Sequence, residues 1–291
     1  MTITVLDGGM GRQLARMGAP FRQPEWSALA LLEGPEWVSR AHRAFIAAGA
    51  DVITTNAYAV VPFHIGEERF AAQGRELADL AGRLAREEAD AADHLVRVAG
   101  SLPPLFGSYR PDLFVPERAP ELLADLVAGQ APYVDVWLAE TQSSIAEATA
   151  AATAIAGDDR PLWISFTLDD DPDATPRIRS GESVGDAAAA AVGLGAQALL
   201  FNCSQPERMA GALTAAAAAA PGLPLGAYAN AFPMIPDDHE ANDTLFGIRT
   251  DLDPDGYWAF ADTWVTAGAT LVGGCCGVGP EQIAALAERL R

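Results

Sequence analysis

Residues 48–56 read Ala-Gly-Ala-Asp-Val-Ile-Thr-Thr-Asn and contain the unit that decides the fold. Gly49 follows a segment with helical spacing and precedes a short β-branched run, Asp51–Thr55. A glycine at this point predicts a left-handed helix cap, because glycine adopts positive φ at little cost. The same order of helix, glycine and strand recurs around Gly195 and Gly268. We interpret this repetition as one repeated structural unit.

Outward from this segment, eight short apolar runs alternate with longer segments that have helical spacing. The predicted strands are Thr2–Leu6, Asp51–Thr55, Val96–Gly100, Val134–Ala139, Leu162–Thr167, Ala198–Phe201, Leu223–Ala227 and Thr270–Val272. The predicted helices include Glu36–Ala48, Glu76–His94, Glu121–Gly129, Ser144–Ala156 and Pro280–Arg291, and the alanine tracts Ala187–Ala191 and Ala215–Ala220 are typical of helices.

Eight strands alternating with helices favour parallel βαβ units, and eight is the number that closes a barrel. We therefore predict an α/β protein with a single (β/α)8 TIM-type barrel domain over residues 1–291. An open doubly wound sheet is the main alternative. It is disfavoured because no glycine-rich turn of the G-x-G-x-x-G type follows the first predicted strand.

Composition and charge exclude several classes of function. The basic residues are 19 arginines with no lysine, which excludes Schiff-base mechanisms and a Walker-A phosphate loop. The net charge of −20 argues against nucleic-acid and membrane-surface partners. Half of the residues are hydrophobic, as in a folded soluble protein. No apolar run approaches the ~20 residues that a membrane span requires. With no signal-peptide pattern at the N-terminus and only three cysteines, we expect a cytoplasmic protein without a disulfide framework.

Polar residues follow the predicted strands at the point where each strand ends. In a barrel these carboxyl ends converge on one mouth, which is where active sites are built. All three cysteines belong to this group. Its members are Asp7, Thr55-Asn56, Ser101, Glu140-Thr141, Thr167, Asn202-Cys203, Asn230 and Cys275-Cys276.

The three cysteines form a candidate metal site. Cys275 and Cys276 are neighbours between glycines, and Cys203 follows another strand. Adjacent side chains of a regular strand point to opposite faces, so both thiols reach one metal only where the backbone bends, as flanking glycines permit. Three thiolates match a catalytic zinc site with one open position, and soft sulfur donors favour zinc over magnesium or calcium. Three buried free thiols are the alternative.

Several segments resemble, in order and spacing, the motifs of the homocysteine S-methyltransferase family. They lie along most of the chain: Leu6–Gly11, Ala48–Asn56, Ala139–Thr141, Ser165–Leu168, Asn202-Cys203 and Gly273–Cys276. The resemblance implies a (β/α)8 barrel in which Cys203, Cys275 and Cys276 bind zinc at the C-terminal mouth. It also implies that the thiol of the substrate takes the open position and is methylated there.

The same resemblance implies three further substrate-binding residues. Asp7 and Glu140 match acidic positions that bind the α-ammonium group of homocysteine, with helix capping or loop hydrogen bonding as the alternative role. Asn230 resembles the asparagine of the family's Tyr-Pro-Asn element, although Ala229 replaces the usual proline.

The segment after the third predicted strand departs from the family pattern, so contacts to the methyl donor are less defined. Aromatic faces attract desolvated cations, and the candidate rings are Trp26, Tyr58, Phe106, Tyr109 and Phe232. Ordinary packing is the alternative role of each. Two acidic segments, Asp169–Asp171 and Asp237–Glu240, are interpreted as solvated loops near the same mouth, where they could act as lids.

The predicted function is zinc-dependent methyl transfer from a sulfonium donor to homocysteine, giving methionine. The donor would be S-methylmethionine or S-adenosylmethionine, and both partners are small molecules. Betaine or a methylated folate as donor, and selenohomocysteine as acceptor, are alternatives within the class. A chain that stops soon after the last motif argues against betaine and folate. A non-catalytic zinc-binding barrel is the alternative from another class, and the sequence leaves open whether the protein is a monomer or a dimer.

Overall fold

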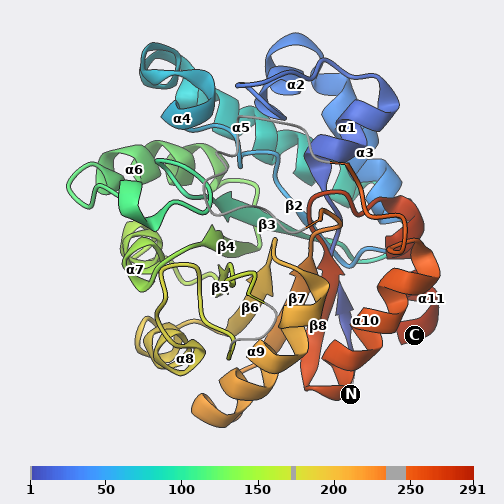
Figure 1. The fold of residues 1–291 in the computed structure, drawn as a ribbon. Coiled ribbons are helices and arrows are strands. Elements are labelled where there is room, and N and C mark those ends of the chain that lie inside the picture. Colours follow the sequence, from blue (N-terminus) through green and yellow to red (C-terminus); the bar gives the residue numbers. More distant parts are fainter. Residues whose placement is uncertain (1, 172–174, 234–246) are drawn as a thin grey trace.

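The computed structural model describes residues 2–171, 175–233 and 247–291, and the described chain forms eight parallel strands surrounded by helices (Figure 1). The strands are β1 (Thr4–Val5), β2 (Val52–Thr54), β3 (Arg97–Leu102), β4 (Val136–Gln142), β5 (Leu162–Phe166), β6 (Ala198–Asn202), β7 (Leu225–Ala229) and β8 (Ala269–Gly274). Each overlaps one of the eight predicted strands.

Helices follow the strands and form the outer ring. They are α1 (Met10–Met17), α2 (Ala28–Glu33), α3 (Pro35–Ala47), α4 (Pro62–Ile65), α5 (Glu67–Asp90), α6 (Ala119–Gln130), α7 (Ile145–Ala154), α8 (Val184–Gly193), α9 (Pro206–Ala219), α10 (Pro254–Thr266) and α11 (Pro280–Leu290), with the 3₁₀ turn Pro111–Leu113 between β3 and α6. The five helices predicted by range correspond to α3, α5, α6, α7 and α11, although α5 begins at Glu67 rather than Glu76.

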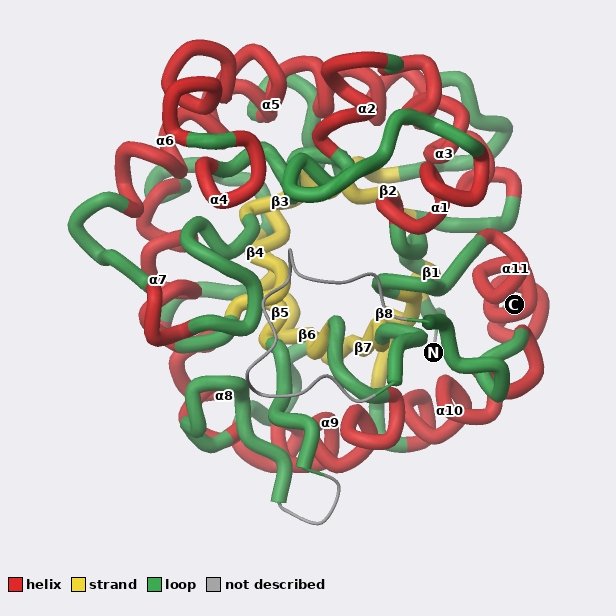
Figure 2. The backbone as a smooth tube through the Cα atoms, turned by 45° about the horizontal axis from the view of Figure 1, so that its top comes forward, coloured by secondary structure: helices red, strands yellow, loops and turns green. Residues whose placement is uncertain are grey.

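Hydrogen bonding orders the strands as β1-β8-β7-β6-β5-β4-β3-β2, so the two ends of the sheet are β1 and β2. These ends meet through a parallel bridge between Leu6 and Val52. The backbone N–H of Asp7 also donates to the carbonyl oxygen of Val52 at 3.0 Å. Figure 2 looks into the resulting ring of strands. The prediction of a (β/α)8 barrel is confirmed.

Local sequence accounts for where the helices begin and end. Gly49, Gly195 and Gly268, which precede β2, β6 and β8, have φ values of 98°, 77° and 104°, as the repeated unit predicts. Ser144 marks the start of α7. Its hydroxyl accepts the backbone N–H of Glu147, and the side chain of Glu147 accepts the backbone N–H of Ser144, which together form a capping box.

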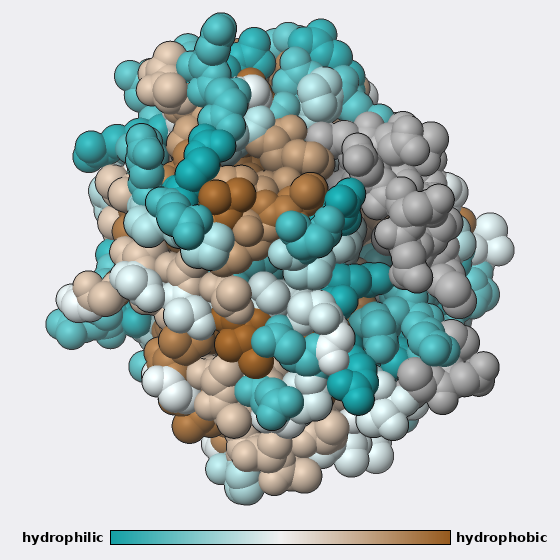
Figure 3. Space-filling model, turned by 60° about the vertical axis from the view of Figure 1, so that its left-hand side comes forward, coloured by the Kyte–Doolittle hydropathy of each residue, from teal (hydrophilic) through white to brown (hydrophobic). Residues whose placement is uncertain are grey.

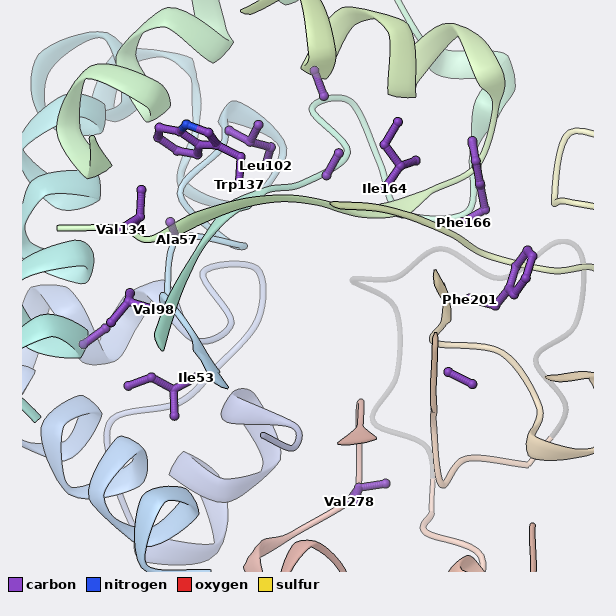
Figure 4. Packing of buried hydrophobic residues seen from close by; sticks show 14 of the residues in the cluster. Ile53, Ala57, Val98, Leu102, Val134, Trp137, Ile164, Phe166, Phe201 and Val278 are labelled. Atoms are coloured by element: carbon purple, nitrogen blue, oxygen red, sulfur yellow. The ribbon is translucent and has the colours of Figure 1, made fainter. Parts of the chain in front are cut away.

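Side chains alternate along each strand between two apolar layers. Ile53, Val98, Trp137 and Ile164 point outward and pack against the helices, as Figure 4 shows for part of this layer. Their neighbours in sequence fill the barrel interior, where residues from all eight strands or their ends form a second cluster: Leu6, Val52, Ala99, Val136, Leu138, Trp163, Ala198, Leu200, Tyr228 and Leu271. The interior is therefore a packed core, and the space for ligands lies above it at the mouth.

The outer surface is mixed in character. On the face in Figure 3, hydrophilic side chains lie between apolar patches. The most exposed of the large hydrophobic residues described is Leu95, whose relative exposure is 85%. Within the described ranges, we find no helix whose length and apolar character would let it cross a membrane.

Candidate active site

A cavity of about 130 Å³ lies at the carboxyl ends of the strands. All three cysteines line it, together with Asp7, Glu140 and four of the five candidate aromatic residues. These residues come from strand ends and from the segments that follow β1, β2, β3, β6, β7 and β8. The mouth predicted from the strand-end pattern is therefore where the cavity lies.

The three thiols converge at this mouth. The Sγ atoms of Cys203, Cys275 and Cys276 all lie within 4.8 Å of one another, and those of Cys203 and Cys276 are 3.7 Å apart. Sulfur atoms bound to one tetrahedral zinc at about 2.3 Å would be separated by about 3.8 Å. The donor set and its spacing thus fit a zinc ion with three protein ligands.

Backbone conformation brings the thiols together. Cys203 follows β6 with φ of 49°, and Gly277 directly after Cys276 has φ of 87°. A Cβ atom on Gly9 would lie 2.5 Å from the carbonyl oxygen of Cys275, so only glycine allows the β1–α1 loop to pack against the cysteine pair. The bend that the neighbouring glycines predict is present.

Positive φ is a shared property of this mouth. In the described ranges four residues other than glycine have it: Trp26, Tyr109, Thr141 and Cys203, with φ between 49° and 65°. All four line the cavity. Thr141 lies where the β4–β5 pairing shifts register, between Ala139 and Gln142. Such conformations cost roughly 1–3 kcal/mol each and concentrate at functional sites.

Asn202 ties three strands to the cysteines. Its Oδ1 accepts the backbone N–H of Thr141 at 3.0 Å and the hydroxyl of Ser165 at 2.7 Å. Its Nδ2 donates to the hydroxyl of Thr141 at 2.8 Å and lies 3.9 Å from the Sγ of Cys275. The buried amide therefore fixes the ends of β4, β5 and β6 beside the thiols.

A phenol lies against the sulfur of Cys203. The Oη of Tyr109 is 2.8 Å from the Sγ of Cys203. Burial raises the pKa of Tyr109 well above its usual value, so the phenol keeps its proton and donates to the sulfur. Hydrogen bonds from Cys275 and Cys276, and then from Tyr109, lower the pKa of Cys203.

The interpretation of Asp169–Asp171 as a solvated loop is wrong for Asp170, and Asp169 is partly buried. Asp170 is buried and its Oδ2 lies 3.0 Å from a guanidinium nitrogen of Arg179. The guanidinium of Arg179 lies 5.4 Å from the centre of the Tyr109 ring, and Asp169 pairs with the buried Arg208. Two residues of the acidic run are therefore paired with arginines, and one of these arginines packs on a ring of the cavity lining. The second acidic segment, Asp237–Glu240, lies outside the described residues.

Asp7 and Glu140 are both buried in the cavity wall. The Oδ2 of Asp7 accepts the backbone N–H of Thr54 at 2.8 Å, and a carboxylate oxygen of Glu140 accepts the hydroxyl of Ser101. Burial raises the pKa of Asp7 to about 7 and that of Glu140 to about 8. A cation placed between them would restore their charged forms, as an ammonium group does.

Two of the sequence candidates lie apart from this cavity. Asn230 is buried, and its Oδ1 accepts the backbone N–H of Phe232 at 3.1 Å, but it is not among the residues that line the cavity. Phe106 packs edge-to-face on Phe114, with ring centres 6.0 Å apart. Two further residues belong to the site: Arg12 lines the cavity, and Asn202 contacts Cys275. Asn202 had a usable signal, its place beside Cys203, whereas Arg12 had none.

The comparisons with known proteins agree with this site. A family model for homocysteine S-methyltransferase matches residues 4–290, so the chain belongs to that family and to the methyltransferase class of enzymes. The homocysteine S-methyltransferase of Escherichia coli (strain K12) is 29% identical over 312 residues, covering 99% of this chain and 95% of the relative.

Two other relatives extend the likeness. Homocysteine S-methyltransferase YbgG of Bacillus subtilis (strain 168) is 29% identical over 321 residues, with 99% and 95% covered. The crystal structure of the metallated form of the homocysteine methyltransferase MmuM from Escherichia coli superposes with a TM-score of 0.81 at 28% identity, covering 99% of this chain and 96% of that one.

Proposed function

We propose that the protein binds zinc through Cys203, Cys275 and Cys276 and transfers a methyl group from a sulfonium donor to homocysteine. The observation that carries the proposal is the convergence of three thiols, within 4.8 Å of one another, in a cavity that also holds two buried carboxylates. When bound, zinc supplies the Lewis acidity that keeps a substrate thiol deprotonated near neutral pH.

Residues of the cavity orient the acceptor. Asp7 and Glu140 bind the α-ammonium group, which directs the side-chain sulfur of homocysteine toward the cysteine cluster. Tyr109 and Asn202 hold Cys203 and Cys275 in place through the contacts described above. The sulfur then attacks the methyl carbon of the donor in line with the leaving sulfur. One S–C bond forms as the other breaks, and the donor leaves as a neutral thioether.

The aromatic lining supports a cationic donor. Guanidinium groups already lie over two of the four lining rings, Arg12 over Phe232 and Arg179 over Tyr109. Trp26 and Tyr58 are therefore the rings proposed to face the sulfonium. Neutralising the cation during transfer is favoured in an apolar, partly desolvated site. We place S-methylmethionine ahead of S-adenosylmethionine as donor.

Initial rates of methionine formation decide the donor when S-methylmethionine, S-adenosylmethionine, betaine and methyltetrahydrofolate are compared at equal concentration on one zinc-loaded sample. We expect turnover with the sulfoniums and none with the other two. Faster turnover with betaine or the folate would refute the donor assignment. No turnover with any donor would favour the non-catalytic barrel.

One relative supports a test of a second acceptor. A protein of Astragalus bisulcatus named selenocysteine methyltransferase is 25% identical over 319 residues, covering 96% of this chain and 90% of the relative. A selenolate is another soft ligand for the same metal. Competition between homocysteine and selenohomocysteine for a limiting amount of S-methylmethionine measures which acceptor this site prefers.

A further inference from the structure

The cavity contains a positive group that the proposed chemistry leaves unused. Arg12 lies in the first turns of α1, lines the cavity and is half-buried. Its guanidinium carbon lies 5.1 Å from the centre of the Phe232 ring, which also lines the cavity. The ring limits the conformations open to the long side chain and thus holds the positive charge at the mouth.

Arg12 adds a positive charge to an otherwise acidic lining. Asp7 and Glu140 supply two carboxyl groups, and Arg12 is the one arginine among the described residues that line the cavity. Burial lowers the pKa of Arg12, while the nearby Cys276 opposes that change. Arginine nevertheless keeps its charge in proteins. The cavity thus offers both acidic and basic partners, which is the pattern that an amino-acid zwitterion requires.

The position of Arg12 also suits the size of the ligand. The α-carbon of homocysteine is two methylene groups from its sulfur, so a sulfur held at the cysteines places the carboxylate close to them. Arg12 and the three cysteines line the same cavity of about 130 Å³. A guanidinium can donate two parallel N–H bonds to a carboxylate, which fixes orientation as well as charge.

We propose that Arg12 binds the α-carboxylate of an amino-acid substrate and thereby determines specificity for α-amino acids over simple thiols or sulfonium compounds. This inference rests on the proposed function. The carboxylate belongs either to homocysteine or to an amino-acid donor such as S-methylmethionine, and the two sources share the same chemistry.

Substitution of Arg12 combined with trimmed substrates tests the assignment. Arg12→Gln removes the charge, Arg12→Met keeps the apolar stem on Phe232, and Arg12→Lys restores a positive charge without the bidentate geometry. Arg40→Gln is the matched control, because Arg40 also lies over an aromatic ring, Trp37 at 4.1 Å, but is exposed on α3 outside the cavity. Circular dichroism and metal content check that each variant is folded and loaded.

For the acceptor arm, homocysteine is compared with 3-aminopropane-1-thiol, which lacks the carboxylate. If Arg12 holds the acceptor, Arg12→Gln and Arg12→Met raise the KM and the calorimetric Kd for homocysteine by about 10–100-fold. The same substitutions raise the values for the trimmed thiol by less than about twofold. Arg12→Lys recovers part of the loss, and Arg40→Gln matches the unsubstituted protein.

For the donor arm, S-methylmethionine is compared with its carboxamide. A loss confined to the carboxylate form of the donor assigns Arg12 to the donor. Equal losses for the carboxylate and trimmed forms in both arms, or no loss in either arm, would overturn the inference. Failure of the unsubstituted protein to methylate any thiol would instead refute the proposed function, so the two failures are distinguishable.

Discussion

The Oη of Tyr109 lies 2.8 Å from the Sγ of Cys203 and donates a hydrogen bond to it. Tyr109 is itself held by Arg179, which is paired with the buried Asp170. A residue of the β3–α6 loop and residues after β5 therefore both act on the orientation of a thiol after β6. Partners of this kind position a ligand and set its affinity for a metal.

Tyr109→Phe removes only the hydroxyl and is expected to lower the affinity for zinc by about 10–100-fold while leaving the fold intact. Competition with a chromophoric chelator measures the affinity. Tyr133→Phe is the control, because its hydroxyl bonds to Asp79 away from the cavity. Unchanged zinc affinity in Tyr109→Phe would show that the contact with Cys203 does not support the metal.

Replacing Cys203, Cys275 or Cys276 with alanine is expected to abolish stoichiometric zinc binding and methyl transfer. The barrel should stay folded, because the cluster lies above the packed interior rather than within it. Elemental analysis measures zinc and circular dichroism measures folding. A full equivalent of zinc retained by the triple variant would contradict the assignment.

The variants Glu140→Gln and Asp7→Asn are expected to retain zinc binding but to have a lower affinity for homocysteine. A charge-assisted hydrogen bond to an ammonium contributes about 1.5–3 kcal/mol. The informative measurement is the ratio of affinity for homocysteine to that for 4-mercaptobutanoate, which lacks the amino group. A ratio that neither substitution changes would place the ammonium elsewhere.

The strand pattern predicted the barrel because each strand and its following polar residues are encoded locally. It also placed the three cysteines, Asp7 and Glu140 at one mouth. The support around Cys203 could not be predicted in this way. Tyr109 reaches it through a loop with positive φ at that residue, and Asp169 is neutralised by Arg208, which is 39 residues away in the chain. Such contacts depend on loop conformation and on packing between elements rather than on local patterns.

Glu140 should make the metal-free protein less stable as the pH rises. Its pKa is raised to about 8 in the fold by burial, whereas an unfolded chain has a glutamate pKa of about 4.3. The folded state thus binds the extra proton, and this contribution to stability is present below about pH 4.3 and is lost as the pH rises through 8. Glu140→Gln is expected to be more stable than the parent by about 1–3 kcal/mol at pH 8, with the difference shrinking toward pH 4.5. Denaturant unfolding across this range measures it, and a pH-independent difference would contradict the cause.

His42 on α3 should have the opposite effect on stability, which it lowers as the pH falls. It is fully buried, and neither ring nitrogen has a hydrogen-bond partner among the described residues. Burial lowers its pKa to about 3, compared with about 6.5 in an unfolded chain. The folded state excludes the proton, so this contribution to stability is present above pH 6.5 and is lost as the pH falls toward 3.

The free energy of unfolding of His42→Leu, relative to that of the parent protein, is therefore expected to rise by about 2 kcal/mol when the pH falls from 7.5 to 5. Each pKa unit is equivalent to about 1.4 kcal/mol. Urea unfolding of both proteins at the two pH values provides the comparison. His94→Leu is the contrasting variant, because hydrogen bonding to Asp93 raises the pKa of that partly exposed ring, and its replacement should bring no gain toward low pH. An equal gain at both pH values would mean that packing rather than protonation explains the effect.

The junction between β1 and β2 closes the barrel with few backbone hydrogen bonds, because these strands have only two and three residues. The side chain of Asp7 adds to that junction by accepting the N–H of Thr54. A group proposed to hold the substrate thus also closes the barrel. Local opening of this junction, seen as amide hydrogen exchange at Thr54, would therefore be coupled to ligand binding, and the rate of exchange would report the occupancy of the cavity without any measurement of turnover.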